Sequence, residues 1–182
     1  KLAKEHGMSA IALTDHGVMY GAIDFYTTCV KNGIKPIIGV EAYVANRTRF
    51  QKEPGIDNKR YHLTLLAKDN TGYQNLIKLT TAAHLEGYYY KPRVDKDLLL
   101  EHAEGLICLS GCPGSELGRA IQSGNKEKAE KVILEYQAIF GPENYYLEIM
   151  HHPDVEFFQD WKNTLIEFSR KLNIPLVATQ DS

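Results

Sequence analysis

Short apolar runs alternate along this chain with longer segments that have one apolar face, a pattern typical of α/β proteins. The short runs predict strands over residues 9–14, 35–44, 62–67, 105–110, 145–150 and 175–179. Apolar residues three or four positions apart predict helices over residues 1–6, 20–32, 71–86, 95–102, 115–122, 126–140 and 155–172. Because most strands are apolar and are followed by helices, we expect a mostly parallel sheet.

The number of strands favours an irregular barrel over an open sheet. Six strands are visible, and a further strand before residue 1 would make seven. The longest predicted loop is the polar segment 45–60. Both ends look cut, because the chain begins within a helical turn and stops directly after its last strand. We therefore interpret residues 1–182 as one α/β domain, incomplete at both ends, of a longer polypeptide.

Composition narrows the class of protein without indicating a function. Of the 182 residues, 43% are hydrophobic and 24% are charged, as in ordinary globular domains. The formal net charge of -2 excludes a global basic field, so any phosphate binding has to be local. No apolar run approaches the ~18 residues of a membrane span, and we expect no signal peptide. Three cysteines without framework spacing favour a reduced, cytoplasmic setting.

The end of the first strand is the most informative stretch. The apolar run before it stops at Thr14, Asp15, His16 and Gly17, so a strand delivers a hydroxyl, a carboxylate and an imidazole to one loop. Gly17 allows the backbone to turn sharply there. In barrels and doubly wound sheets, chemistry is located at such strand ends. Alternatively, Asp15 caps the next helix and His16 is a surface turn residue.

Other strand ends also carry residues of the types that bind metal ions. Glu41 lies near the end of the second strand, and His62 adjoins the third. Cys112 follows the strand over 105–110, and Asp181 follows the last strand. Imidazole, carboxylate and thiolate groups bind Zn²⁺, Mn²⁺ or Fe²⁺, and more than four ligands imply more than one ion. The pattern predicts a metal cluster where these strand ends converge.

Several of these residues also have a plainer interpretation. Glu41 alternates with apolar neighbours, as an outward-facing strand carboxylate does, and His62 begins its apolar run, which favours a core histidine. Cys112 lies among small residues that leave a thiol accessible. Arg93 is either a solvated loop residue or, near a metal cluster, a phosphate clamp, because a guanidinium pairs with two oxygens at once. The three tyrosines at 88–90 either stack on bases or pack one ring inward.

Six segments, in order along the chain, carry a family resemblance. They are TDHGVMYGAIDFY, KPIIGVEAYV, YHLTLLAKDNTGYQNLIKL, YKPRVD, GLICLSGCPGSE and VATQD. Together they resemble the PHP (polymerase and histidinol phosphatase) domain of bacterial DNA polymerase III alpha subunits. The third and fifth segments are more specific than TDHG, which many PHP proteins share. The resemblance extends over essentially the whole chain.

The resemblance implies a distorted (β/α)7 barrel with a trinuclear metal site at the strand ends. By position it implies the metal ligands His16, Glu41, His62, Cys112 and Asp181, with Arg93 as the site arginine and Asp15 as the catalytic neighbour of His16. The family's opening His-x-His strand would precede Lys1, and its closing His would follow Ser182. Gln180 stands where the family usually has Asn, which bears on hydrogen bonding around the ligands.

The resemblance implies that the parent protein is a DNA-directed DNA polymerase. This domain would be a metal-dependent phosphoesterase, and most specifically a 3′–5′ proofreading exonuclease. A second hypothesis is an inactive scaffold that stabilises the polymerase and docks a separate exonuclease subunit. A third, which the YHLTLLAKDNTGYQNLIKL segment argues against, is a stand-alone phosphatase of the histidinol phosphatase type.

Cofactors and partners follow from the same resemblance. The implied cofactors are up to three Zn, Mn or Fe ions in the full-length protein, and Mg in the polymerase part outside this sequence. The implied partners are DNA, the sliding clamp and an exonuclease subunit of the replicative holoenzyme. The implied location is the cytoplasm, with no membrane partner.

Overall fold

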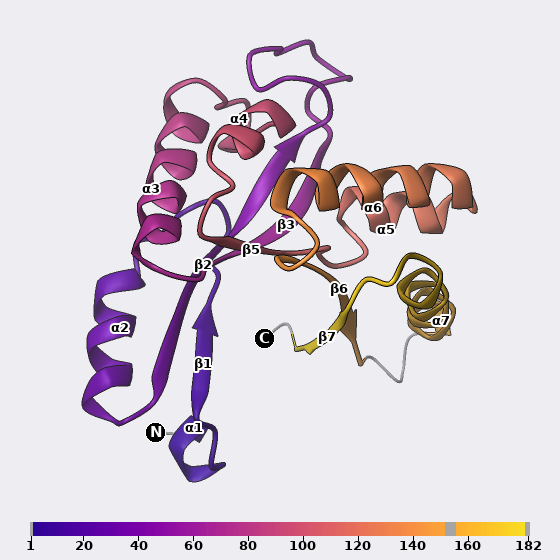
Figure 1. Ribbon diagram of the computed structural model, residues 1–182. Coiled ribbons are helices and arrows are strands. Elements are labelled where there is room, and N and C mark those ends of the chain that lie inside the picture. Colours follow the sequence, from indigo (N-terminus) through magenta and orange to yellow (C-terminus); the bar gives the residue numbers. More distant parts are fainter. Residues whose placement is uncertain (1, 152–155, 181–182) are drawn as a thin grey trace. The chain divides into compact units, whose positions relative to one another are not determined.

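The computed structural model describes residues 2–151 and 156–180, and its chain divides into two compact units (Figure 1). The first unit comprises residues 1–60 and 64–106, and the second comprises residues 61–63 and 107–182. Strand β3 (Arg60–Ala67) contributes residues to both units.

The first unit is built around the long strand β2. Its other elements are α1 (Leu2–Glu5), β1 (Ala10–Leu13), α2 (Ala22–Lys31), β2 (Lys35–Ala45), α3 (Asn70–Leu85), β4 (Arg93–Val94) and α4 (Lys96–Glu101), together with most of β3. β1 pairs with β2 in parallel, from Ala10 opposite Lys35 to Leu13 opposite Ile38. β4 pairs in parallel with the far end of β2, and α2 and α3 pack along β2 (Figure 1).

Strand β3 runs antiparallel to β2. The carbonyl of Leu65 lies beside Gly39, whereas the guanidinium of Arg60 lies over the ring of Tyr43. Residue numbers therefore rise along β2 and fall along β3, so β3 begins where β2 ends. A connection without a helix joins antiparallel strands, whereas a parallel pair needs a crossover. The loop over residues 46–59 contains no helix, so β3 departs from the parallel pattern predicted from the sequence.

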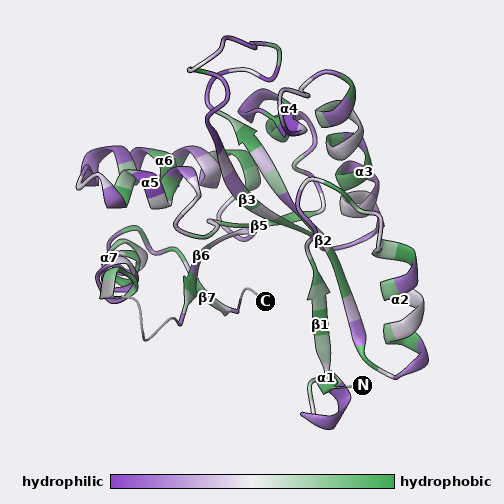
Figure 2. Ribbon diagram, turned by 180° about the vertical axis from the view of Figure 1, so that it is seen from behind, coloured by the Kyte–Doolittle hydropathy of each residue, from purple (hydrophilic) through white to green (hydrophobic). Residues whose placement is uncertain are grey.

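The second unit is a parallel sheet with helices packed on it. Its elements are β5 (Leu106–Leu109), α5 (Glu116–Gln122), α6 (Lys126–Phe140), β6 (Tyr145–Met150), α7 (Glu156–Leu172) and β7 (Leu176–Thr179). β6 is the middle strand and pairs in parallel with both β5 and β7. Tyr136 of α6 stacks on Tyr145 of β6 with ring centroids 6.2 Å apart, and Trp161 of α7 is buried. Figure 2 shows hydrophobic and hydrophilic residues alternating around these helices.

Side-chain caps explain where several helices begin. Each cap accepts a hydrogen bond from a backbone N–H in the first turn, which satisfies a donor that the helix leaves unpaired. The caps are Asp69 for α3, Asp95 for α4, Ser115 for α5 and Asn125 for α6. Asp, Ser and Asn are all strong N-caps, so the polar residues before each apolar stripe set these boundaries.

The predicted helices and strands are confirmed, with ends displaced by at most two residues. The sequence reading missed β4, because a strand of two residues is too short to show any period. Among the described helices, none is long and apolar enough to cross a membrane. That residues 1–182 form an incomplete domain stays a prediction.

Candidate metal centre

The loop after β1 brings His16 against Glu41 of β2. His16 forms an isolated parallel bridge with Glu41, and the N–H of Gly17 donates to the Glu41 carbonyl at 2.9 Å. His16 Nε2 lies 3.2 Å from Glu41 Oε2. The His16 side chain is 53% exposed and that of Glu41 is 13% exposed. This pair of ligand-type residues is therefore open to solvent on its imidazole side.

Gly17 makes the sharp turn after His16, as the sequence predicts. Its φ is +69°, a conformation that side chains with a Cβ rarely adopt. A Cβ at this position would lie 2.9 Å from Pro92 Cγ and 3.2 Å from the Tyr43 ring. Any other residue would therefore move the loop that carries His16.

Asp15 ties the same loop to β2. Its carbonyl accepts a hydrogen bond from the N–H of Glu41 at 3.0 Å, and its carboxylate lies near Gly21. Gly21, not Asp15, is the N-cap of α2, so the interpretation of Asp15 as a helix cap is wrong. Its catalytic role stays a prediction.

In the second unit, His62 and Cys112 form another pair of ligand-type residues. Cys112 Sγ lies 3.9 Å from His62 Nδ1, and the N–H of Gly114 donates to the same sulfur at 3.4 Å. The N–H of His62 donates to the Gly114 carbonyl at 3.4 Å. Both side chains are only half-buried, so the interpretation of His62 as a core histidine is wrong.

The distances within each pair fit chelation of a metal ion. A nitrogen and an oxygen each about 2.1 Å from a tetrahedral zinc ion stand about 3.4 Å apart. A thiolate sulfur about 2.3 Å from the ion and a nitrogen about 2.1 Å from it stand about 3.6 Å apart. The observed separations, 3.2 Å for His16–Glu41 and 3.9 Å for His62–Cys112, need only shifts of a few tenths of an ångström. The first pair offers an imidazole and a carboxylate and the second an imidazole and a thiolate, which are donors that borderline divalent metals prefer.

Four of the five predicted ligands thus lie in two pairs, one pair in each unit. Asp181 lies outside the described residues. That all five residues bind the same metal cluster stays a prediction.

Arg93, the predicted site arginine, is fully buried. Its guanidinium donates to the carbonyls of Gly87 at 2.9 Å, Asp57 at 2.8 Å, Arg49 at 3.0 Å and Gln51 at 3.0 Å. An arginine side chain has five N–H donors, so four are committed to backbone. The side chain therefore fixes the loop over residues 46–59 and is not the solvated loop residue considered from the sequence. Its role as a phosphate clamp stays a prediction.

Two other cations, which the sequence reading did not single out, lie beside the first pair. Arg60 Cζ and Lys91 Nζ lie 5.5 Å and 5.8 Å from the Tyr43 ring centroid. The His16 ring lies 6.0 Å from the same centroid. Burial raises the pKa of the Tyr43 hydroxyl, Arg60 partly offsets this, and Glu41 adds to it. The sequence did hold a signal for the ring that both cations contact. Tyr43 follows Glu41 by two positions, so both side chains stand on one face of β2.

The tyrosines at 88–90 do not share one environment. Tyr88 and Tyr90 are exposed, whereas Tyr89 is half-buried. The guanidinium of Arg93 lies 5.3 Å from the Tyr89 ring. Tyr89 is therefore the most enclosed of the three rings, and stacking of the tyrosines on bases stays a prediction.

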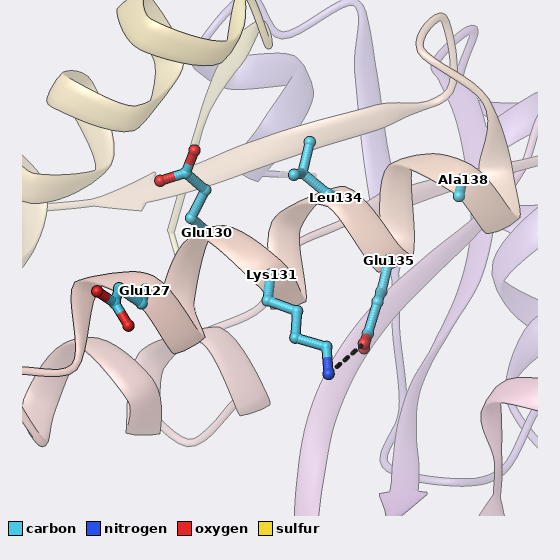
Figure 3. A pocket seen from close by; sticks show the side chains of 6 residues that line it. All are labelled: Glu127, Glu130, Lys131, Leu134, Glu135 and Ala138. Carbon is cyan, nitrogen blue, oxygen red and sulfur yellow. Dashed lines mark ion pairs between the residues drawn. The ribbon is translucent and has the colours of Figure 1, made fainter.

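A shallow hollow elsewhere, along the surface of α6, lacks the chemistry of a site (Figure 3). It is lined by Glu127, Glu130, Lys131, Leu134, Glu135 and Ala138. Lys131 and Glu135 form an ion pair one helical turn apart, and no imidazole or thiol lines the hollow. It carries none of the predicted ligands.

Residues 1–152 match the family model described as the PHP domain, and the chain belongs to this family. Among curated proteins, it is 47% identical to the DNA polymerase III alpha subunit of Treponema pallidum, 48% to that of Borreliella burgdorferi and 47% to that of Thermus aquaticus. These alignments cover 100%, 99% and 94% of this chain. The chain spans only 16%, 16% and 14% of the length of those relatives.

Two solved structures share the fold. An amidohydrolase from Chromobacterium violaceum superposes with a TM-score of 0.59 at 15% identity, covering 99% of this chain and 78% of that one. A Bifidobacterium adolescentis protein, assigned as a candidate metal-dependent phosphoesterase, gives 0.54 at 10% identity, covering 100% and 79%. The α/β fold of the PHP type predicted from the sequence is confirmed.

Proposed function

We propose that this chain is the PHP domain of a bacterial DNA polymerase III alpha subunit and acts there as a metal-dependent phosphoesterase. Its most specific activity would be removal of nucleotides from the 3′ end of single-stranded DNA. The observation that carries the proposal is the occurrence of two residue pairs at chelating distances in a PHP family member.

The proposed metal ligands are His16, Glu41, His62, Cys112 and Asp181, holding up to three Zn, Mn or Fe ions. When bound, such ions polarise phosphoryl oxygens and lower the pKa of a coordinated water. The role of the chain is to hold an imidazole, a carboxylate and a thiolate in fixed directions. The turn at Gly17 and the hydrogen bond from Gly114 to Cys112 Sγ serve this purpose.

Arg60 and Lys91 are the proposed contacts for the non-bridging phosphate oxygens, since both cations lie beside the Tyr43 ring that neighbours His16. Asp15 is proposed to accept a proton from the attacking water. Arg93, proposed from the sequence as the clamp, reaches a phosphate only if it gives up carbonyl bonds. We therefore favour Arg60 for the direct contact.

The test is hydrolysis of a 3′-labelled single-stranded oligonucleotide by the full-length protein in Mn²⁺ or Zn²⁺. We expect a double variant His16→Ala, Cys112→Ala to lose hydrolysis while polymerase activity remains. His84→Ala is the matched control, because this histidine lies on α3, bonds to the Thr80 carbonyl one turn away and is none of the proposed ligands. Unchanged hydrolysis in the double variant would overturn the assignment.

A second candidate is a structural scaffold that stabilises the polymerase and docks a separate exonuclease subunit. The commitment of Arg93 to four carbonyls favours this function, because it removes the predicted phosphate clamp from solvent. Metal analysis of the full-length protein separates the two. A protein without metal whose melting temperature ignores a chelator supports the scaffold.

The wider assignment rests on the relatives. In it, the parent protein synthesises DNA with Mg in a part outside this chain, and works in the cytoplasm. Its proposed partners are DNA, the sliding clamp and an exonuclease subunit. The identity of 47% to 48% with polymerase subunits favours this setting over a stand-alone phosphatase of the histidinol phosphatase type.

A further inference from the structure

Glu148 is a buried carboxylate in the middle of the second unit. It lies on β6, the central strand of β5, β6 and β7, and is 3% exposed. Side chains alternate across a strand, so Glu148 points away from the face on which Tyr145 stacks against α6. Burial of a charge is unfavourable unless hydrogen bonds compensate it, so the hydrogen-bond partners of Glu148 indicate its role.

The carboxylate joins the ends of both neighbouring strands. Oε2 accepts the N–H of Gly111 at 3.1 Å, directly after β5. Oε1 accepts the hydroxyl of Thr179 at 2.7 Å, at the end of β7. The backbone N–H of Glu148 donates to Ser110 Oγ at 2.9 Å. One side chain on the middle strand therefore holds the two outer strand ends.

Each strand end leads into a proposed ligand. Gly111 precedes Cys112, and Thr179 stands two positions before Asp181. Gly111 has φ +81°, and a Cβ there would lie 2.9 Å from the His62 carbonyl oxygen. The hydrogen bond to Glu148 thus fixes the backbone of Gly111, which packs closely against the His62 carbonyl. The direction of the Cys112 side chain toward His62 Nδ1 depends on the backbone at Gly111.

We propose that Glu148 is a positioning residue for metal binding: it sets the end of β5 that leads into Cys112. The inference rests on the proposed function, in which Cys112 is a ligand. Glu148 does not itself bind the ion in this role. It lowers the cost of bringing the thiolate into place by holding the loop before metal arrives.

The test uses cobalt as the probe, because a thiolate–cobalt absorption band reports directly on Cys112. The full chain is titrated with Co²⁺ as wild type, Glu148→Leu and Glu148→Gln. Leu removes both acceptors, and we expect a ten- to hundredfold loss of Co²⁺ affinity with a weaker thiolate band. Gln still accepts from Gly111 and can donate to the Thr179 hydroxyl, so we expect it to restore most of the affinity.

A second readout needs no metal. Cys29 and Cys108 are buried, whereas Cys112 is half-buried, so alkylation of the folded chain reports on Cys112. We expect Glu148→Leu to change the alkylation rate severalfold, because the loop loses its anchor. Leu147→Ala is the matched control, since it destabilises the same strand from the opposite face. If Glu148→Leu does not fold, Thr179→Val, which removes one of the two bonds, takes its place with a severalfold loss of affinity.

The outcomes separate the two proposals. Absence of a thiolate band in the wild type overturns the ligand role of Cys112, and with it the inference. A band in the wild type with unchanged affinity and alkylation in Glu148→Leu overturns the positioning role alone. An equal loss of affinity in Leu147→Ala at matched stability also overturns it, because the effect is then general to the strand.

Discussion

Each of the two units holds a loop in place, and the two do so in different ways. In the first unit, the loop over residues 46–59 is held by charges: Arg47 pairs with Asp57, Arg49 with Asp95, and buried Arg93 binds four carbonyls. In the second unit, the loop after β5 is held by one carboxylate, Glu148, whose partners are a backbone N–H and a hydroxyl.

The comparison shows that a long polar loop and a short loop can be held by different kinds of hydrogen-bond partner. Paired charges hold a long polar loop in place, but each pair loses its attraction when the carboxylate is protonated. A single carboxylate bound to neutral donors fixes a short loop with fewer groups. We therefore expect the stability of the loop over residues 46–59 to depend on its arginines, and to fall more in acid than that of the loop after β5.

The largest expected effect is that of Arg93→Met. This substitution removes the donor of four carbonyls, two of them in buried hydrogen bonds, and we expect a loss of about 3–5 kcal/mol in the free energy of unfolding. Urea denaturation of the chain measures it. Arg119→Met on the exposed side of α5 is the control, with an expected change within about 0.5 kcal/mol. A loss below about 1 kcal/mol for Arg93→Met would mean that the carbonyl bonds do not organise the loop.

The regular elements could be predicted because apolar spacing records which face is buried. The uninterrupted apolar run of β1 is typical of a strand, the apolar stripe of α3 follows the helix period, and Asp69 marks the beginning of α3. The position of His62 at the start of its strand could not be assigned from the residues, because chain direction leaves no local signature. The structure explains it, since β3 begins where β2 ends.

The candidate site was predicted in part for a similar reason. Residue type and the family resemblance identified His16, Glu41, His62 and Cys112. They did not reveal that Arg93 is turned inward to carbonyls, because a loop arginine has the same sequence signal in either role. Glu148 was missed because one charged residue in an apolar strand resembles an ordinary outward-facing position.

Metal addition is expected to produce the next largest effect. Zn²⁺ at about a hundredfold above its dissociation constant stabilises the folded chain by about 2.7 kcal/mol, which raises the melting temperature by about 5–10 °C. Differential scanning calorimetry with and without chelator measures the shift. Under the proposed function, His16→Ala and Cys112→Ser each reduce it, whereas His84→Ala keeps it. A reduction in only one of the two variants would restrict metal binding to one unit.

Acid should weaken the loop over residues 46–59. Hydrogen bonds from Arg47 lower the pKa of the Asp57 carboxyl from 3.8 to about 2. Because the folded pKa is the lower one, its stabilisation is fully present above about pH 4 and is lost as the pH falls through about 2. Urea midpoints between pH 5 and 2 measure this loss. We expect Asp57→Asn to be less stable than wild type at pH 7 and to lose less across this range. Parallel curves for both proteins would contradict the assignment.

The smallest effect is expected for a solvent-exposed ion pair. Comparing it with the Arg47–Asp57 pair tests whether the stability of the loop over residues 46–59 comes from charge alone or from burial of the carboxylate. Lys126 Nζ lies 2.9 Å from Glu167 Oε2, with side chains 66% and 61% exposed. A double-mutant cycle with Lys126→Met and Glu167→Gln should give a coupling energy below about 1 kcal/mol that vanishes in high salt. The same cycle on Arg47 and Asp57, whose carboxylate is buried, should give a larger coupling that salt reduces less. Equal couplings would show that the loop over residues 46–59 gains nothing from enclosing its carboxylate.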